Sequence, residues 1–408
     1  MDREQREKRE RTSPCTFDTA RGRYVTMGND DSAHKGQPVI NLFSVSGMEI
    51  RAHYSALFVF GALASVIAYG LLPELTPAAS SAERLAVALL VSLLLSASIL
   101  LHEFGHALVA LRRGKAVAGI TLYFFGGAAH ICEQGLTPGD DIAIFAAGPA
   151  VSVFFAVLFG GAGAAMTATH RAAASLLFVI GAANALLAAF NLLPGLPMDG
   201  GRILRAVLWK LSGNVLSATR RAALAGRLVA YCLSAAGCYA ALRGNLVAGI
   251  WGVSIGWFLA GLAQAHYRTT LTRVALDGLR AGDVCVRDLP TLQTSDSLAQ
   301  AALLFAPGAK SRTLAVLFGE RPAGLFSDVD LGRGQRGAAD ATVGALMTRA
   351  ADLPAIDTDD DALQALEALG DGPAAALLVE HDGAYAGLIR REDVARYVDM
   401  VEAVGKKV

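Results

Sequence analysis

The sequence predicts a six-helix polytopic membrane protein that is followed by a soluble α/β domain. Hydrophobic residues make up 53% of the 408 residues and charged residues only 18%, whereas about a quarter of a soluble protein is charged. The mean hydropathy of +0.43 agrees with insertion in a membrane. Beyond His266 short Val- and Leu-rich runs alternate with helical stretches, which is typical of a soluble α/β fold.

Six apolar stretches are long enough to cross a bilayer as helices, for which about 20 residues are needed. They cover roughly residues 54–72, 84–111, 142–166, 172–193, 222–242 and 245–264. A shorter Gly-rich piece, LYFFGGAAHICEQGLTPGD, lies between the second and third stretches. It is too short to span, so we expect a re-entrant hairpin or an interfacial strand whose backbone groups are satisfied by protein.

Lysine and arginine alternate between rich and poor loops, and this alternation indicates how the spans are oriented. Nine lie in the segment up to Arg51, and five lie between Arg202 and Arg221. The loops after the first, third and fifth spans carry one each. The pattern predicts a multi-pass protein of the cell membrane with both termini in the cytoplasm.

Composition also sets the expected domains and partners. We expect a polar cytoplasmic tail at 1–48, a membrane domain at 49–267 and a soluble domain at 276–400. A net charge of zero gives no global sign of nucleic-acid binding, so nucleic acid is not an expected partner. The apolar stretches make membrane lipid the expected surroundings of the chain. The five cysteines are irregularly spaced, so no disulfide framework and no CxxC site are expected.

The second span contains LLHEFGHALVALRRG, which has the His-Glu-x-x-His pattern. On a helix His102 and His106 lie on one face, one turn apart, where two imidazoles can bind one Zn²⁺. Glu103 would then lie beside the open position of the metal and accept a proton from water. Counting back from Arg112 at the cytoplasmic interface, at 1.5 Å per residue, puts the metal on the order of 10–15 Å inside the membrane.

Two structural histidines that are hydrogen-bonded between helices are the alternative to a metal site. That reading leaves Glu103 unexplained, because an ionisable side chain in hydrocarbon is costly and usually functional. The sequence therefore favours a metal site.

Catalytic zinc normally has three protein ligands and a water, so a third ligand is needed. Asp199 follows the fourth span in NLLPGLPMDGGR, where two prolines break the helix. Gly200 and Gly201 permit a tight return, which could turn the carboxylate back toward the helices. A Pro/Gly turn with a solvated aspartate explains this segment equally well.

HEFGH in an apolar helix, followed two spans later by NLLPGLPMDGG, resembles the site-2 protease family of intramembrane metalloproteases. The segments FGG at 125–127 and AAGPAVS at 146–152 fit the same family, and the resemblance covers about residues 40–265. In one departure, Ser152 stands where many relatives have Asn, so the role of that position is open.

The resemblance implies one zinc ion per chain, held by His102, His106 and Asp199, with Glu103 as general base. It also implies a substrate with a transmembrane segment, such as a tethered transcription regulator or an anti-sigma factor. Asn191 matches the family pattern, and it could orient substrate or stabilise an oxyanion. A hydrogen bond between membrane helices explains Asn191 equally well.

Gly126 and Gly127 could offer an open strand edge to an extended substrate. Such an edge suits the reaction, because a helical substrate shields its peptide bonds and must unwind before it is cut. A tight turn is the alternative reading of this glycine pair.

The soluble domain contains an internal repeat, with GLFSDVDL at 324–331 and GLIRREDV at 387–394. The copies cover about 276–337 and 338–400. This repeat resembles a pair of cystathionine-β-synthase (CBS) domains, which often bind adenine nucleotides between the copies.

The CBS resemblance implies nucleotide contacts by Ser327 and Asp330 in the first copy. In the second copy Asp393 is the corresponding candidate nucleotide contact, but Arg390 replaces Ser or Thr, so we expect at most one competent site. A module for homodimerisation or substrate docking that binds no ligand is the alternative.

Together these features predict a zinc-dependent intramembrane endopeptidase that is modulated by nucleotide at its CBS domains. A CBS-gated transporter or channel is one alternative, and it would need further ionisable groups along a route across the membrane, which the spans lack. A non-catalytic metal-binding scaffold is the other, and the intact Glu103 argues against it.

Overall fold

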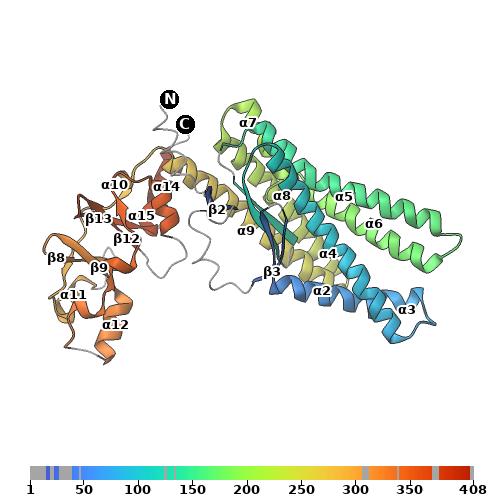
Figure 1. Ribbon diagram of the computed structural model, residues 1–408, viewed down its shortest axis with the longest axis horizontal. Coiled ribbons are helices and arrows are strands. Elements are labelled where there is room, and N and C mark those ends of the chain that lie inside the picture. Colours follow the sequence, from blue (N-terminus) through green and yellow to red (C-terminus); the bar gives the residue numbers. More distant parts are fainter. Residues whose placement is uncertain are drawn as a thin grey trace. The chain divides into compact units, whose positions relative to one another are not determined.

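The computed structural model describes residues 15–18, 23–26, 39–45, 47–123, 126–132, 135–305, 312–337, 340–369 and 376–404. The chain divides into two compact units, Met1–Thr270 and Leu271–Val408. The boundary falls inside the long helix α9 (Leu246–Leu276) (Figure 1).

Six helical segments of the described chain are long and apolar enough to cross a membrane, which confirms the predicted number. They are Tyr54–Leu75, Ser81–Arg112 (α4), Pro138–Met166 (α5), Arg171–Asn191 (α6), Val215–Leu242 (α8) and Leu246–Leu276 (α9). The first consists of α2 (Tyr54–Val66), a π-helical turn (Ile67–Leu71) and α3 (Leu72–Leu75). Capping boxes at Ser80 and Thr137 satisfy the first amides of α4 and α5.

Between α6 and α8 lies a shorter helix, α7 (Asp199–Ser212), which ends at Gly213 in a left-handed conformation. Both apolar and cationic residues occur along it, and Arg205 and Ala206 are buried. The predicted break after the fourth span is confirmed, because α6 ends at Asn191 and α7 begins at Asp199.

A four-stranded sheet packs against these helices in the order β3-β4-β5-β6. Its strands are β3 (Val39–Val45), β4 (Met48–His53), β5 (Val117–Tyr123) and β6 (Gly126–Ile131). β4 and β5 are parallel and the other pairs are antiparallel. The apolar face of the sheet, including Met48 and Ile120, forms one core with Ala107 of α4 and Ile144 of α5.

The Gly-rich piece after the second span contains the end of β5 and all of β6, which pair antiparallel. It is extended, as both predicted alternatives require, and its depth in the membrane stays a prediction. The sheet also reaches into the segment assigned to the polar tail, since β3 lies within 1–48. Two short antiparallel strands, β1 (Cys15–Asp18) and β2 (Arg23–Thr26), lie earlier still, and the rest of 1–38 is outside the described residues. Cys132, directly after β6, is disulfide-bonded, which the irregular cysteine spacing did not predict.

The second unit contains the same motif twice, which bears out the predicted fold class. The first copy has β7 (Leu292–Gln293), α11 (Leu298–Leu304), β8 (Thr313–Phe318), β9 (Arg321–Ser327) and α12 (Asp328–Gly337). The second has β11 (Ile356–Asp357), α14 (Ala362–Ala368), β12 (Ala376–His381), β13 (Ala384–Arg390) and α15 (Arg391–Val404). In each, the first strand is parallel to the second and the second is antiparallel to the third. The two sheets share a core that includes Ala315, Leu325 and Leu388.

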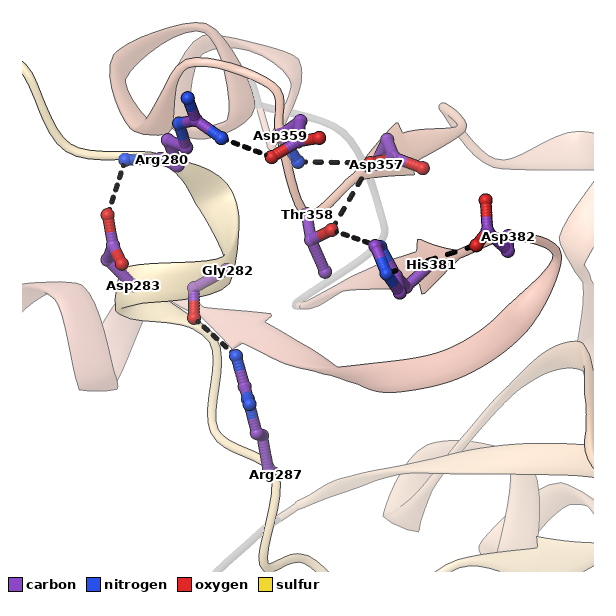
Figure 2. Close-up of polar contacts among 9 residues, drawn as sticks. All are labelled: Arg280, Gly282, Asp283, Arg287, Asp357, Thr358, Asp359, His381 and Asp382. Atoms are coloured by element: carbon purple, nitrogen blue, oxygen red, sulfur yellow. Dashed lines mark hydrogen bonds and ion pairs between the residues drawn. The ribbon is translucent and has the colours of Figure 1, made fainter.

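The beginning of the predicted first copy, before β7, joins the second copy instead. The amide of Gly282, in α10 (Ala281–Val284), donates to the Thr358 carbonyl (2.9 Å), and the amide of Val286 donates to the Leu388 carbonyl (2.8 Å). Figure 2 shows the polar contacts around this crossing, where Arg280 pairs with Asp359. The copies are thus interlinked, so a cut at 337/338 would not separate two complete units.

Candidate metal centre and active site

The two histidines of the HEFGH motif lie side by side on the buried face of α4. Each is only 3% exposed, and their Nε2 atoms are 3.2 Å apart. The spacing of four residues produces this arrangement, because one helical turn separates the two side chains.

Both imidazoles are oriented by contacts from α5. His106 Nδ1 is 2.7 Å from the Ile144 carbonyl oxygen; a carbonyl can only accept, so Nδ1 carries the proton and Nε2 is left with a lone pair. His102 Nδ1 is 2.8 Å from the Ser152 hydroxyl, so its Nε2 is directed toward the Nε2 of His106. Such contacts to the outer nitrogen are what metal-binding histidines usually have.

Asp199, the first residue of α7, brings a carboxylate to this pair. Its Oδ2 is 3.2 Å from His102 Nε2 and 3.3 Å from His106 Nε2. The ligand atoms of these three residues lie within 4.8 Å of one another. Two imidazole nitrogens and one carboxylate oxygen, converging at the buried face of a helix, fit the donor set of a catalytic zinc site that keeps one position open.

Glycines let the loop before Asp199 pack tightly enough to reach the histidines. A Cβ on Gly201 would lie 2.1 Å from the Gly195 carbonyl carbon, and one on Gly226 of α8 would lie 1.8 Å from the Leu196 carbonyl oxygen. The amide of Leu196 also donates to the Ala222 carbonyl (3.1 Å). The loop is therefore held between the first turn of α7 and the side of α8.

Gly148 of α5 leaves the space in front of the two imidazoles open. A Cβ at this position would lie 2.2 Å from His106 Nε2 and 2.6 Å from His102 Nε2. Any side chain there would enter the volume where the three ligand atoms meet.

Glu103 points to the sheet, toward strand β6. The amide of Ala129 donates to Glu103 Oε2 (3.2 Å), and a Cβ on Gly127 would lie 2.3 Å from Glu103 Cγ. β6 is the last strand in the sheet, so its outer edge runs past the carboxylate. Gly126, at the start of β6, has φ +129°, a conformation that suits glycine.

Asn191, the last residue of α6, is half-buried and eight residues from Asp199 along the chain. Its predicted catalytic role stays a prediction.

The predicted nucleotide residues differ between the two copies of the soluble unit. In the first copy the Ser327 hydroxyl donates to Asp330 Oδ2 (2.6 Å) at the start of α12. In the second copy Arg390, which is 4% exposed, forms a two-point ion pair with the buried Asp393. The arginine thus engages the aspartate that was predicted to contact a nucleotide.

Sequence reasoning did not single out Gly148, and it left the role of Ser152 open. Both roles depend on which face of α5 meets α4, and no local pattern reveals that. The AAGPAVS segment was the available signal, because it contains both positions.

Comparison with known proteins gives two family matches. A model described as Peptidase family M50 matches residues 90–168 and 162–235. A CBS domain model matches residues 343–399, which is the second copy of the repeat.

Among curated relatives, Rip3 of Mycobacterium tuberculosis, whose name describes it as a zinc metalloprotease, is 31% identical over 76% of this chain and 80% of its own length. A Synechocystis protein with the same description is 31% identical over 62% of this chain and 66% of its own. A solved site-2 protease from Methanocaldococcus jannaschii is 25% identical over 56% of this chain and 95% of that chain, with a TM-score of 0.39.

Proposed function

The chain belongs to peptidase family M50, the site-2 protease family, and is a zinc metalloprotease of the membrane; on this basis we propose that it cleaves a peptide bond in or beside the membrane-spanning part of a protein substrate. We assign zinc binding to His102, His106 and Asp199, and the general base to Glu103. The observation that carries this assignment is the convergence of three ligand atoms within 4.8 Å, from α4 and from the start of α7.

The protein side chains divide the work of peptide hydrolysis. Zinc supplies Lewis acidity at such a site, lowering the pKa of water and polarising a carbonyl. Ser152 and the Ile144 carbonyl hold the imidazoles so that both Nε2 atoms face the same point. Glu103 accepts a proton from the attacking water and passes one to the leaving amine.

The substrate segment is proposed to bind as an extended strand beside β6. The outer edge of this terminal strand passes Glu103, and the Ala129 amide is already directed at that carboxylate. A peptide added to the edge would place its backbone within reach of the base. Gly126 and Gly127 are the proposed substrate contacts, and Asn191 is proposed to orient the peptide.

The test of this assignment compares Glu103→Gln and Asp199→Ala with the wild type. Glu103→Gln should keep its zinc and lose cleavage of a membrane-spanning reporter peptide by at least about 100-fold, the usual size of a general-base contribution. Asp199→Ala should lose zinc as well as activity. Glu83→Gln is the matched control, since Glu83 lies on the same helix as an exposed capping residue and glutamine can replace it in a capping box.

Zinc content by atomic absorption and cleavage by gel mobility are the two measurements. Wild-type cleavage by Glu103→Gln would overturn the proposed base. Full zinc content in Asp199→Ala would overturn the proposed third ligand.

We further propose that an adenine nucleotide binds the first CBS copy and modulates the protease. Ser327 stands at the place of Arg390, so Asp330 lacks the buried two-point ion pair that engages Asp393 and has only a longer contact with the exposed Arg333. Asp393 is therefore proposed to make no nucleotide contact. Calorimetry of the full chain in detergent with ATP, ADP and AMP tests this. Asp330→Asn should abolish the heat of binding while Asp328→Asn, two residues away, should keep it; no heat with any nucleotide for the wild type removes the proposal.

The remaining partners are proposals that the family suggests. Tethered transcription regulators and anti-sigma factors are the proposed substrates, and the CBS unit is a proposed site of homodimerisation. Both termini are proposed to be cytoplasmic, from the distribution of Lys and Arg.

A further inference from the structure

A buried ion pair joins α7 to α5 close to the metal centre. Arg205 Nη2 lies 2.6 Å from Asp141 Oδ2. Asp141 is completely buried and Arg205 is 9% exposed. Buried charges are costly unless they are paired, so neither side chain can leave this contact cheaply.

A second contact between the same two helices lies one turn away. The guanidinium of Arg202 lies over the ring of Phe145, 4.4 Å from its centroid. The Phe145 ring in turn contacts the His106 ring, with centroids 5.6 Å apart. Arg202 and Arg205 are three residues apart on α7, and Asp141 and Phe145 are four apart on α5, so the two contacts lie along one seam.

This seam connects α7 and α4, which carry the proposed ligands, with α5, which orients the two imidazoles. Asp199 is the first residue of α7, six residues or about 9 Å along the helix from Arg205. α5 contributes Asp141 and Phe145 to the seam, and it also holds the two imidazoles through Ile144 and Ser152. Any rotation or sliding of α7 on α5 would therefore move the Asp199 carboxylate relative to the histidines.

We propose that Asp141 and Arg205 are positioning residues that hold α7 in the one placement in which Asp199 completes the metal site. This inference rests on the proposed role of Asp199 as a ligand. An apolar contact could stabilise the packing of α7 on α5 equally well, but it would not fix how α7 is rotated about its axis. A charge-assisted hydrogen bond depends on the direction of donor and acceptor, so it does fix that rotation.

The experiment separates positioning from stability. In the double variant Asp141→Leu/Arg205→Met the charges are replaced by apolar side chains, an exchange that is often neutral for folding. We expect its thermal midpoint in detergent to stay within a few degrees of the wild type. Zinc affinity, measured by competition with a chromophoric chelator, should fall on the order of 10- to 100-fold, as when support around a metal site is removed.

The visible absorption of the Co²⁺-substituted protein gives a second readout, because it depends on ligand geometry and should change in the double variant. Lys210→Met removes an exposed cation from the same helix, so it should leave both the affinity and the spectrum unchanged. If the double variant fails to fold, Asp141→Glu serves in its place. It keeps the charge, moves the carboxylate by about one methylene, and should also weaken zinc binding.

Wild-type zinc affinity and cobalt spectrum in a folded double variant, or in Asp141→Glu, would overturn the positioning role. Asp199→Ala, measured in the same series, distinguishes a failure of the positioning role from a failure of the proposed metal site. If Asp199→Ala loses zinc while the pair variants do not, only this inference fails; if Asp199→Ala binds zinc as the wild type does, the proposed metal site itself fails.

Discussion

At the scale of single residues, the proposed metal site depends on the absence of a side chain at Gly148 as much as on the three ligands. Gly148 has no side chain at the point where both Nε2 atoms face Asp199, and even one methyl group would overlap both imidazoles. The overlap involves ring atoms on a packed helix, which cannot move aside without leaving their contacts on α5. The identity of this glycine is thus tied to the function of the histidines.

Gly148→Ala is expected to lower zinc affinity by at least about 100-fold, the upper end of what indirect changes at a metal site cause. The cause is steric, so the helix itself should be no less stable, because Ala is the better helix former. Gly160→Ala, on the same helix with open space around it, is the matched control. Equal zinc affinity in both variants would show that the two imidazoles do not share a ligand at this point.

Ser152, which departs from the family pattern, contacts one of the two proposed histidine ligands. Its hydroxyl contacts His102 Nδ1, and the residue is completely buried. Ser152→Ala should weaken zinc binding on the order of 10-fold, since loss of an outer contact leaves the ring free to turn. Ser175→Ala is the control, because it removes a hydroxyl that is bonded to a carbonyl of its own helix, and it should bind zinc normally. If Ser175→Ala lost as much zinc affinity as Ser152→Ala, the effect would not come from the contact with His102.

At the scale of secondary-structure elements, β6 and α7 are the two that bring chemistry to the histidine helix. β6 is the end strand of the sheet, and a Cβ at position 127 would lie 2.3 Å from Glu103 Cγ. α7 begins with Asp199, and its first turn packs directly on the preceding loop. Neither element is among the segments long and apolar enough to cross a membrane, but both are positioned by helices that are.

Gly127→Ala should displace the Glu103 side chain while leaving the histidines in place. We therefore expect cleavage of the reporter peptide to fall by about 100-fold, as for a misplaced base, with zinc content unchanged. Gly61→Ala, in open space on α2, controls for the loss of a glycine. Normal cleavage by Gly127→Ala would mean that Glu103 does not act from its contact with β6.

At the scale of the whole molecule, orientation decides from which side the proposed site meets water and substrate. The connections between spans that are rich in Lys and Arg include the one that contains α7, which begins with Asp199, and the one that follows α4, which carries His102 and His106. Positive loops favour the cytoplasmic side, so both the site and the CBS unit are expected to face the cytoplasm.

Cysteine labelling in intact cells tests this orientation. A cysteine at Ala168, an exposed position between α5 and α6, should react with an impermeant maleimide added outside. A cysteine at Lys210 of α7 should react only after the cells are permeabilised, and each is compared with the unmodified chain. The reverse pattern would invert the proposed topology.

The sequence by itself determined the features that depend on neighbouring residues. Apolar length sets the six spans, because each helix must satisfy its own backbone in lipid. The spacing of His102 and His106 places both side chains on the same face of a helix. The prolines before Asp199 prevent α6 from continuing. The repeat in the soluble unit was also visible, because each copy is one local supersecondary motif.

Only the tertiary structure decided which distant segments meet. Asp199 reaches His102 across 97 positions, and a Pro/Gly turn with a solvated aspartate was an equal reading until α7 was seen docked on α5. β4 pairs with β5 across two intervening spans, Tyr54–Leu75 and Ser81–Arg112. No pattern near residue 39 reveals this pairing, so β3 was assigned to the tail. Such contacts come from packing between helices and strands, and no local pattern encodes which faces will meet.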